Sequence, residues 1–146
     1  MARTIIGVIG GYVLAFILNF AGFVTLYAVI GQDQAFEPGR YLASTKWIAI
    51  SFVIFLISGL IAGLVCALIA GGGRAPLALA IVVVVLGILL AIPAMLKANV
   101  NSKLVRNGDV PQMQAAQLAY WPVWCPFAFP FISAAGIMIG GKLKRR

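Results

Sequence analysis

The chain has 146 residues, of which 63% are hydrophobic and 10% are charged, and its mean hydropathy is +1.08. Soluble globular domains carry about 25% charged residues, so this composition excludes a soluble fold and indicates an integral membrane protein. The sequence contains no histidine, which excludes imidazole metal ligands and histidine acid–base catalysis.

Charged residues divide the sequence into four uncharged runs, each longer than the ~20 residues that a helix needs to cross a bilayer core of ~30 Å. We therefore expect an all-α fold, an antiparallel bundle of four transmembrane helices in a single membrane domain. The expected spans are approximately residues 5–30, 47–70, 76–96 and 118–141. The remaining segments are outer loops 31–46 and 97–117, a cytoplasmic turn 71–75 and a basic tail 142–146.

The first span carries a stripe of small residues at every fourth position, Gly7, Gly11 and Ala15, and the same face then reaches Asn19. Arg3 before an apolar run resembles the start of a signal peptide, but the run exceeds the ~7–15 residues of a signal core, so we expect a retained span. An amide inside a bilayer needs a partner, and for Asn19 we favour a hydrogen bond to another helix over a role in ligand binding.

The first outer loop contains two local signals. Glu37-Pro38-Gly39-Arg40 predicts a β-turn, because proline presets φ at the second position and glycine accepts a positive φ at the third. Ser44 or Thr45 is expected to cap the second helix.

The second span repeats the small-residue pattern. Gly59, Gly63 and Ala67 share one helical face, and such faces let helices approach closely in lipid. We expect this face to meet the small residues of the first span at 7, 11 and 15. Triple glycine at 71–73 followed by Pro76 predicts a helix stop and a helix start, joined by a turn short enough to make an antiparallel hairpin.

The third span is expected to continue past Lys97 into water and to end at Asn107-Gly108. Asp109 with Gln112 then fits an N-terminal cap of a new helix. The outer loop 97–117 therefore predicts an extramembrane helical hairpin.

The start of the fourth span has a proline at every fourth position, residues 122, 126 and 130. In a helix these prolines would leave the carbonyls of residues 118, 122 and 126 unpaired in one column, which lipid does not tolerate. Two alternatives stay open: the segment is extended until about Phe127, or Pro122 lies in the first helical turn. In the helical interpretation the face docks a partner, and the candidate docking residues are Trp121, Pro122, Trp124, Pro126 and Pro130.

Positive charges give a weak orientation signal. With four spans, six Lys and Arg residues lie on the side of the termini and five on the other side. The dense basic tail next to the last span favours cytoplasmic termini, in what we expect to be a bacterial cytoplasmic (inner) membrane. The net charge of +8 indicates anionic lipid headgroups as partners rather than nucleic acid. The expected lipid-contact residues are Lys142, Lys144, Arg145 and Arg146.

The sequence offers no catalytic, metal-binding or cofactor-binding constellation. The spans contain no acid or base, and Cys66 and Cys125 are expected near opposite ends of their helices, beyond disulfide reach. We therefore expect no cofactor and no enzyme activity. The favoured function is an accessory or structural subunit that packs against other membrane proteins or copies of itself, and the alternative is a small oligomeric channel or carrier for an uncharged or small solute.

Overall fold

The computed structural model describes residues 1–144 and is all α-helical apart from two isolated bridges. Its helices are α1 (Ala2–Ala35), α2 (Thr45–Ala70), α3 (Ala75–Asn101), α4 (Gln112–Leu118) and α5 (Cys125–Leu143). Among the described residues, the four long helices α1, α2, α3 and α5 are long and apolar enough to cross a membrane. The expected four-span membrane fold is confirmed.

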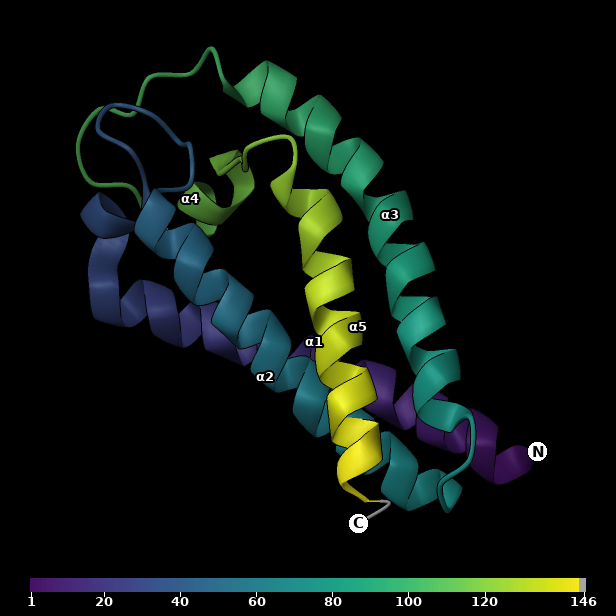
Figure 1. The fold of residues 1–146 in the computed structure, drawn as a ribbon. Helices are drawn as coiled ribbons and strands as arrows, with labels where there is room; N and C mark the ends of the chain where they lie inside the picture. Colours follow the sequence, from purple (N-terminus) through teal and green to yellow (C-terminus); the bar gives the residue numbers. More distant parts are fainter. Residues whose placement is uncertain (145–146) are drawn as a thin grey trace.

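Helix α5 is central in the bundle and packs against both α2 and α3, while α1 packs mainly along α2 (Figure 1). Both termini lie at the same end of the molecule as the turn between α2 and α3 (Figure 1). The hairpin of α2 and α3 is antiparallel as expected, but the two helices diverge. Their contact is small because α3 packs along α5 instead.

The closest approach in the bundle is between α2 and α5, and glycines on both helices make it possible. A Cβ atom on Gly59 or Gly63 of α2 would overlap the backbone of α5, and one on Gly136 or Gly140 of α5 would overlap the backbone of α2. Because association in lipid depends on van der Waals contact between backbones, this pair is the rigid centre of the fold.

The ends of α2 follow the local signals of the sequence. The Ser44 side chain accepts a hydrogen bond of 3.2 Å from the backbone N–H of Trp47 and caps the first turn. Gly71 adopts the left-handed conformation (φ 77°, ψ 13°) and ends the helix. Pro76 lies in the first turn of α3, where its missing N–H costs no helical hydrogen bond.

Helix α1 has 34 residues and is therefore about 50 Å long, which exceeds the ~30 Å of a bilayer core. Its helical geometry breaks at Gly31 (φ 71°, ψ 172°), and its last turn lies beside the outer loops. The expected β-turn is present, with Gly39 at φ 71° and a 3.2 Å hydrogen bond from the Arg40 N–H to the Glu37 carbonyl. Bridges Phe36–Ala43 and Leu42–Tyr120 tie these loops together.

The fourth long helix begins at Cys125, later than the expected residue 118, and residues 119–124 are not helical. The Tyr120 N–H donates to the Tyr41 carbonyl at 3.0 Å, and its own carbonyl accepts from Ala43 at 3.0 Å, so the backbone pairs with the first outer loop instead of closing a helical turn. Pro122 also disfavours helical geometry at the residue before it. The segment is therefore non-helical through Pro122, as in the extended alternative, but a turn at Val123 and Trp124 follows and the helix begins two residues before Phe127.

The outer loop between α3 and α5 also departs from expectation. Helix α3 continues past Lys97, as predicted, but ends at Asn101 rather than at Asn107-Gly108. The N-cap of α4 is Pro111, without a side-chain cap, so the capping arrangement expected for Asp109 is wrong. Asp109 instead accepts a hydrogen bond from the side-chain amide of Gln32 in α1, which draws this loop onto the end of α1.

Candidate functional site: a lateral cleft between helices α1 and α3

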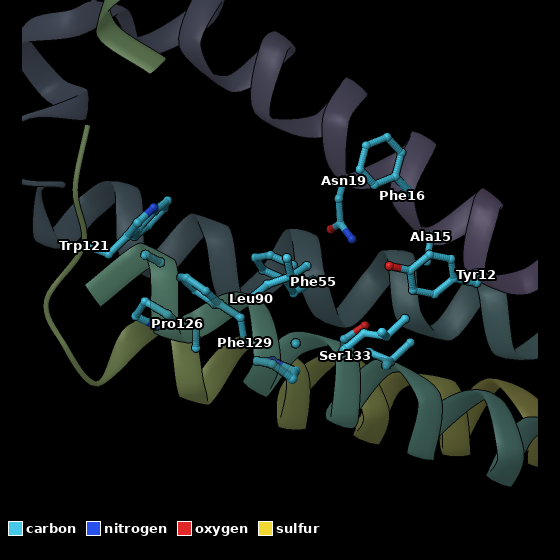
Figure 2. A pocket seen from close by; sticks show the side chains of 16 residues that line it. Tyr12, Ala15, Phe16, Asn19, Phe55, Leu90, Trp121, Pro126, Phe129 and Ser133 are labelled. Carbon is cyan, nitrogen blue, oxygen red and sulfur yellow. The ribbon is translucent and has the colours of Figure 1, made fainter. Parts of the chain in front are cut away.

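A cleft of about 310 Å³ lies within the bundle and opens between α1 and α3 (Figure 2). Its floor is formed by α2 and α5, and the segment before α5 contributes Trp121. The lining residues are Tyr12, Ala15, Phe16, Asn19, Phe55, Val83, Leu86, Gly87, Leu90, Ala91, Ala94, Trp121, Pro126, Phe129, Pro130 and Ser133.

The cleft exists because α1 and α3 approach each other near the end of the bundle that carries the two termini. A Cβ atom on Gly11 would lie 2.6 Å from Leu79 of α3, and Ala15, Leu79 and Ala80 belong to one buried cluster with residues of α2 and α5. Farther out, the two helices diverge (Figure 1), and their mutual contact is small. The opening therefore lies along the apolar middle part of α3, between residues 83 and 94.

Aromatic rings form the outer part of the cleft floor. Phe55 of α2 and Phe129 of α5 are stacked, with centroids 4.6 Å apart and planes at 21°. Trp121 meets Phe129 edge-on at 5.0 Å and Phe23 of α1 at 6.2 Å. Such pairs are more favourable than their buried area alone, so the floor is held in place by three helices and the segment before α5.

Three polar side chains line the cleft: Tyr12 and Asn19 from α1 and Ser133 from α5. Figure 2 shows their polar atoms directed into the opening. The Oδ1 atom of Asn19 accepts a 2.8 Å hydrogen bond from the hydroxyl of Ser58 in α2. The hydrogen bond that we expected between Asn19 and another helix is thus present. Asn19 also lines the cleft, so the less favoured role in ligand binding stays a prediction.

Two side chains of α3 fix the outer segment beside the end of that helix. Lys97 Nζ donates to the Ala116 carbonyl at 3.2 Å, and Asn101 Nδ2 donates to the Leu118 carbonyl at 2.9 Å. Asn101 is buried. These bonds satisfy the end of α4 and hold the chain that leads to Trp121.

The small residues of α1 lie against α2, as predicted, but against a different face of it. A Cβ on Gly7 would lie 2.9 Å from the Cys66 carbonyl oxygen, and one on Gly11 would lie 3.2 Å from that of Ala62. The prediction that this stripe meets Gly59 and Gly63 is wrong, because those glycines face α5.

Ala67 also lies toward α5. It is buried, and its carbonyl accepts a 2.8 Å hydrogen bond from Lys144 Nζ, just past the end of α5. Lys144 therefore also stabilises the carbonyl end of α2, a favourable position for a cation. Lys142 is exposed, whereas Arg145 and Arg146 lie outside the described residues.

The residues predicted to dock a partner separate into two groups. Pro130 is buried and lies against Gly87 of α3, while Trp121 and Pro126 line the cleft. The proline face therefore meets α3 of the same chain. Pro122 and Trp124 precede α5 and line a second depression, where Trp124 is exposed and Pro122 is half-buried.

The predicted column of unpaired carbonyls is also wrong at its two outer positions. The Leu118 carbonyl accepts from Asn101, and the Pro122 carbonyl accepts from the Cys125 N–H at 2.9 Å. Of the three carbonyls, that of Pro126 loses its helical hydrogen bond for the reason predicted. Its donor would be residue 130, and Pro130 lies inside α5 and has no N–H.

A second depression, here called the outer hollow, has a volume of about 330 Å³ and lies where the outer loop meets α2 and the start of α5. It is lined by Glu37, Leu42, Ala43, Thr45, Ile48, Ala49, Phe52, Pro122 and Trp124. The Trp124 ring packs 6.0 Å from that of Phe52, yet 56% of the residue stays exposed.

Sequence reasoning missed Tyr12 and Ser133 as members of a site. The sequence of α1 did indicate that Tyr12 belongs with Asn19. With Phe16 between them, these residues recur at helical spacing and share one face. The part played by Ser133 depends on how α5 is rotated against α3, which no local pattern reports.

The side chains that usually bind metal ions are not clustered in the described part of the chain. Within residues 1–144, no three His, Cys, Asp or Glu side chains are placed to hold a metal ion. Cys66 and Cys125 are both buried and unbonded, in different clusters. Comparison with known proteins finds no matching family model, no matching curated protein and no matching solved structure.

Proposed function

We propose that this protein is a non-catalytic accessory subunit that binds another integral membrane protein through the outer hollow. The observation that carries the proposal is Trp124, which is 56% exposed at the edge of a depression of about 330 Å³. Tryptophan is one of the residue types, with tyrosine and arginine, that are enriched among the residues contributing most to the binding energy of interfaces.

The surroundings of the hollow favour a protein partner. Trp124 is held on one side by Phe52 of α2, and the backbone behind it is fixed by the hydrogen bonds of Tyr120 to the first outer loop. A preorganised surface loses little conformational freedom on binding, which favours association. The hollow contains one carboxylate, Glu37, beside apolar residues, and that composition suits an interface better than acid–base chemistry.

The proposed location is a bacterial cytoplasmic membrane with both termini in the cytoplasm. The basic residues at that end support this orientation, because Arg74 and Lys142 are exposed beside the membrane-spanning segments. In this orientation the outer hollow faces away from the cytoplasm. Partners there are membrane proteins with an exposed outer edge, and anionic lipid headgroups contact the basic end.

Site-specific photo-crosslinking in intact cells tests the proposal. A photoreactive phenylalanine analogue replaces Trp124 in one variant and Phe131 in a control variant, because Phe131 is also 56% exposed but lies on α5 away from the hollow. We expect position 124, and not position 131, to give one discrete adduct with a foreign membrane protein. Trp124→Ala should then reduce recovery of that protein in mild detergent.

Two outcomes would contradict the proposal. Equal or absent crosslinking at both positions would mean that Trp124 is an ordinary interfacial residue in contact with lipid. Crosslinking only between copies of this chain, together with solute flux in liposomes, would instead support the small oligomeric channel or carrier.

A further inference from the structure

The cleft between α1 and α3 holds hydrogen-bonding groups that the fold leaves without partners. Ser133 is only 3% exposed, and its hydroxyl forms no hydrogen bond within residues 1–144. The Tyr12 hydroxyl and the Nδ2 atom of Asn19 likewise bind no group in the described part of the chain, since the hydrogen bond from Ser58 reaches Oδ1 of Asn19 and not Nδ2. Figure 2 shows the three side chains converging on the same space.

The chemistry of these groups specifies what they would bind. The amide nitrogen of Asn19 can only donate, and the hydroxyls of Tyr12 and Ser133 can donate as well. Unpaired donors in an apolar environment are costly, so an occupant with acceptor oxygens is favoured. No charged side chain lines the cleft, so the occupant should be neutral.

The position of the site along α5 restricts the class of ligand further. Helix α5 has 19 residues and is about 28 Å long, close to the thickness of the bilayer core, and Ser133 lies near its middle. The ester carbonyls of phospholipids lie at the edge of the core, about 15 Å from that level. The acceptor must therefore belong to a molecule that dissolves within the hydrocarbon core.

The apolar part of the cleft fits a flat ring. The stacked pair Phe55–Phe129 and the indole of Trp121 offer aromatic surfaces next to the polar groups. A volume of about 310 Å³ is at the lower end of the range for small-molecule sites. It is too small for a partner helix, which is about 10 Å across.

We propose that this cleft binds a membrane-soluble quinone, a neutral ring that bears carbonyl oxygens and a hydrocarbon tail. The ring lies on the aromatic floor, its carbonyl oxygens accept hydrogen bonds from Asn19, Ser133 and Tyr12, and its tail leaves between α1 and α3 into lipid. The proposal concerns binding alone and involves no electron transfer. It is independent of partner binding at the outer hollow, which shares no lining residue with the cleft.

Tryptophan fluorescence in lipid nanodiscs provides the test, with a decyl-tailed benzoquinone as the probe. One reporter variant keeps only Trp121, which lines the cleft, and a matched variant keeps only Trp124, which lies in the outer hollow. We expect saturable quenching of Trp121, whereas quenching of Trp124 should rise in proportion to the quinone dissolved in the membrane.

Side-chain variants then test the binding geometry. Tyr12→Phe and Ser133→Ala each remove one hydroxyl and should weaken binding about two- to tenfold, the effect of losing one hydrogen bond. Ser51→Ala is the matched control, because Ser51 is also buried but bonds to the Trp47 carbonyl. Ala94→Leu should abolish saturable quenching by filling the cleft, while Ala21→Leu on the exposed side of α1 should not.

Three results would overturn the proposal. Equal quenching of both reporters would show simple partitioning into the bilayer. Equal binding of a decylbenzene probe, which lacks the carbonyl oxygens, would show that the polar groups do not select the ligand. Quenching of Trp121 by brominated phospholipid chains that the quinone cannot displace would identify the cleft as an acyl-chain groove.

Discussion

Replacement of Gly63 by alanine should destabilise the bundle through the contact between α2 and α5. A Cβ atom at this position would lie 2.6 Å from the Cα of Ile137, about 0.8 Å short of the 3.4 Å at which ordinary contact begins. Because the obstructing atoms belong to the backbone of α5, no side-chain rotation can relieve the overlap. The two helices would have to separate along their whole interface.

The change in the free energy of unfolding expected for Gly63→Ala is the difference between two opposing contributions. Overpacking of a well-packed interface costs about 1–3 kcal/mol, and backbone contacts lie at the upper end. Alanine recovers about 1 kcal/mol of intrinsic helix propensity over glycine. We therefore expect Gly63→Ala to lower the free energy of unfolding by about 2 kcal/mol, and Gly63→Leu to prevent assembly of the bundle.

Gly10→Ala is the matched control. A Cβ at residue 10 would first meet the flexible tip of Ile69, at 3.4 Å, which is an ordinary contact. This variant should be as stable as the wild type or slightly more stable. Unfolding by denaturing detergent, followed by circular dichroism, measures both variants, and equal stabilities for Gly63→Ala and the wild type would refute the packing of α2 on α5.

Two further perturbations test local interactions. Ser44→Ala should lower stability by about 1 kcal/mol, because it removes the N-cap of α2, and denaturant titration of the variant measures the loss. A double-mutant cycle of Asn19→Leu and Ser58→Ala should give a coupling energy of about 0.6 kcal/mol, typical of a hydrogen bond between transmembrane helices, and a coupling of zero would argue against the α1–α2 hydrogen bond.

The spans and helix ends could be predicted from the sequence because their causes are local. In lipid every backbone N–H and C=O group needs a hydrogen bond within the protein. A long uncharged run can meet this requirement by forming a helix. The cap at Ser44 and the left-handed stop at Gly71 depend only on neighbouring residues. For the start of α5 the sequence left several alternatives open, and the choice between them depends on a contact far away in the sequence, the pairing of Tyr120 with Tyr41.

The pairing of the small-residue stripes could not be predicted, because spacing identifies a face and not its partner. Helix α2 has two such faces, and α1 lies on the one that contains Ala62 and Cys66. The face with Gly63 meets α5, where Gly136 and Gly140 have the same spacing of four. The stripe in α5 was visible in the sequence, but α1 has the same spacing at Gly7 and Gly11, so spacing alone does not decide which stripe meets Gly63.

The position of the cleft follows from the distribution of side-chain size along α1. Its small residues Gly7, Gly11 and Ala15 lie in the half next to the N-terminus, where α1 approaches both α2 and α3. Beyond Ala15 the cleft-lining side chains of α1 are Phe16 and Asn19, which are larger than the glycine that allows the close approach at Gly11. Because the α2–α5 pair remains tightly packed at this level, α1 and α3 separate while the floor between them stays closed. A change in side-chain size along one helix therefore accompanies an opening between two apolar helices, α1 and α3, which is the access route that the proposed membrane-soluble ligand requires.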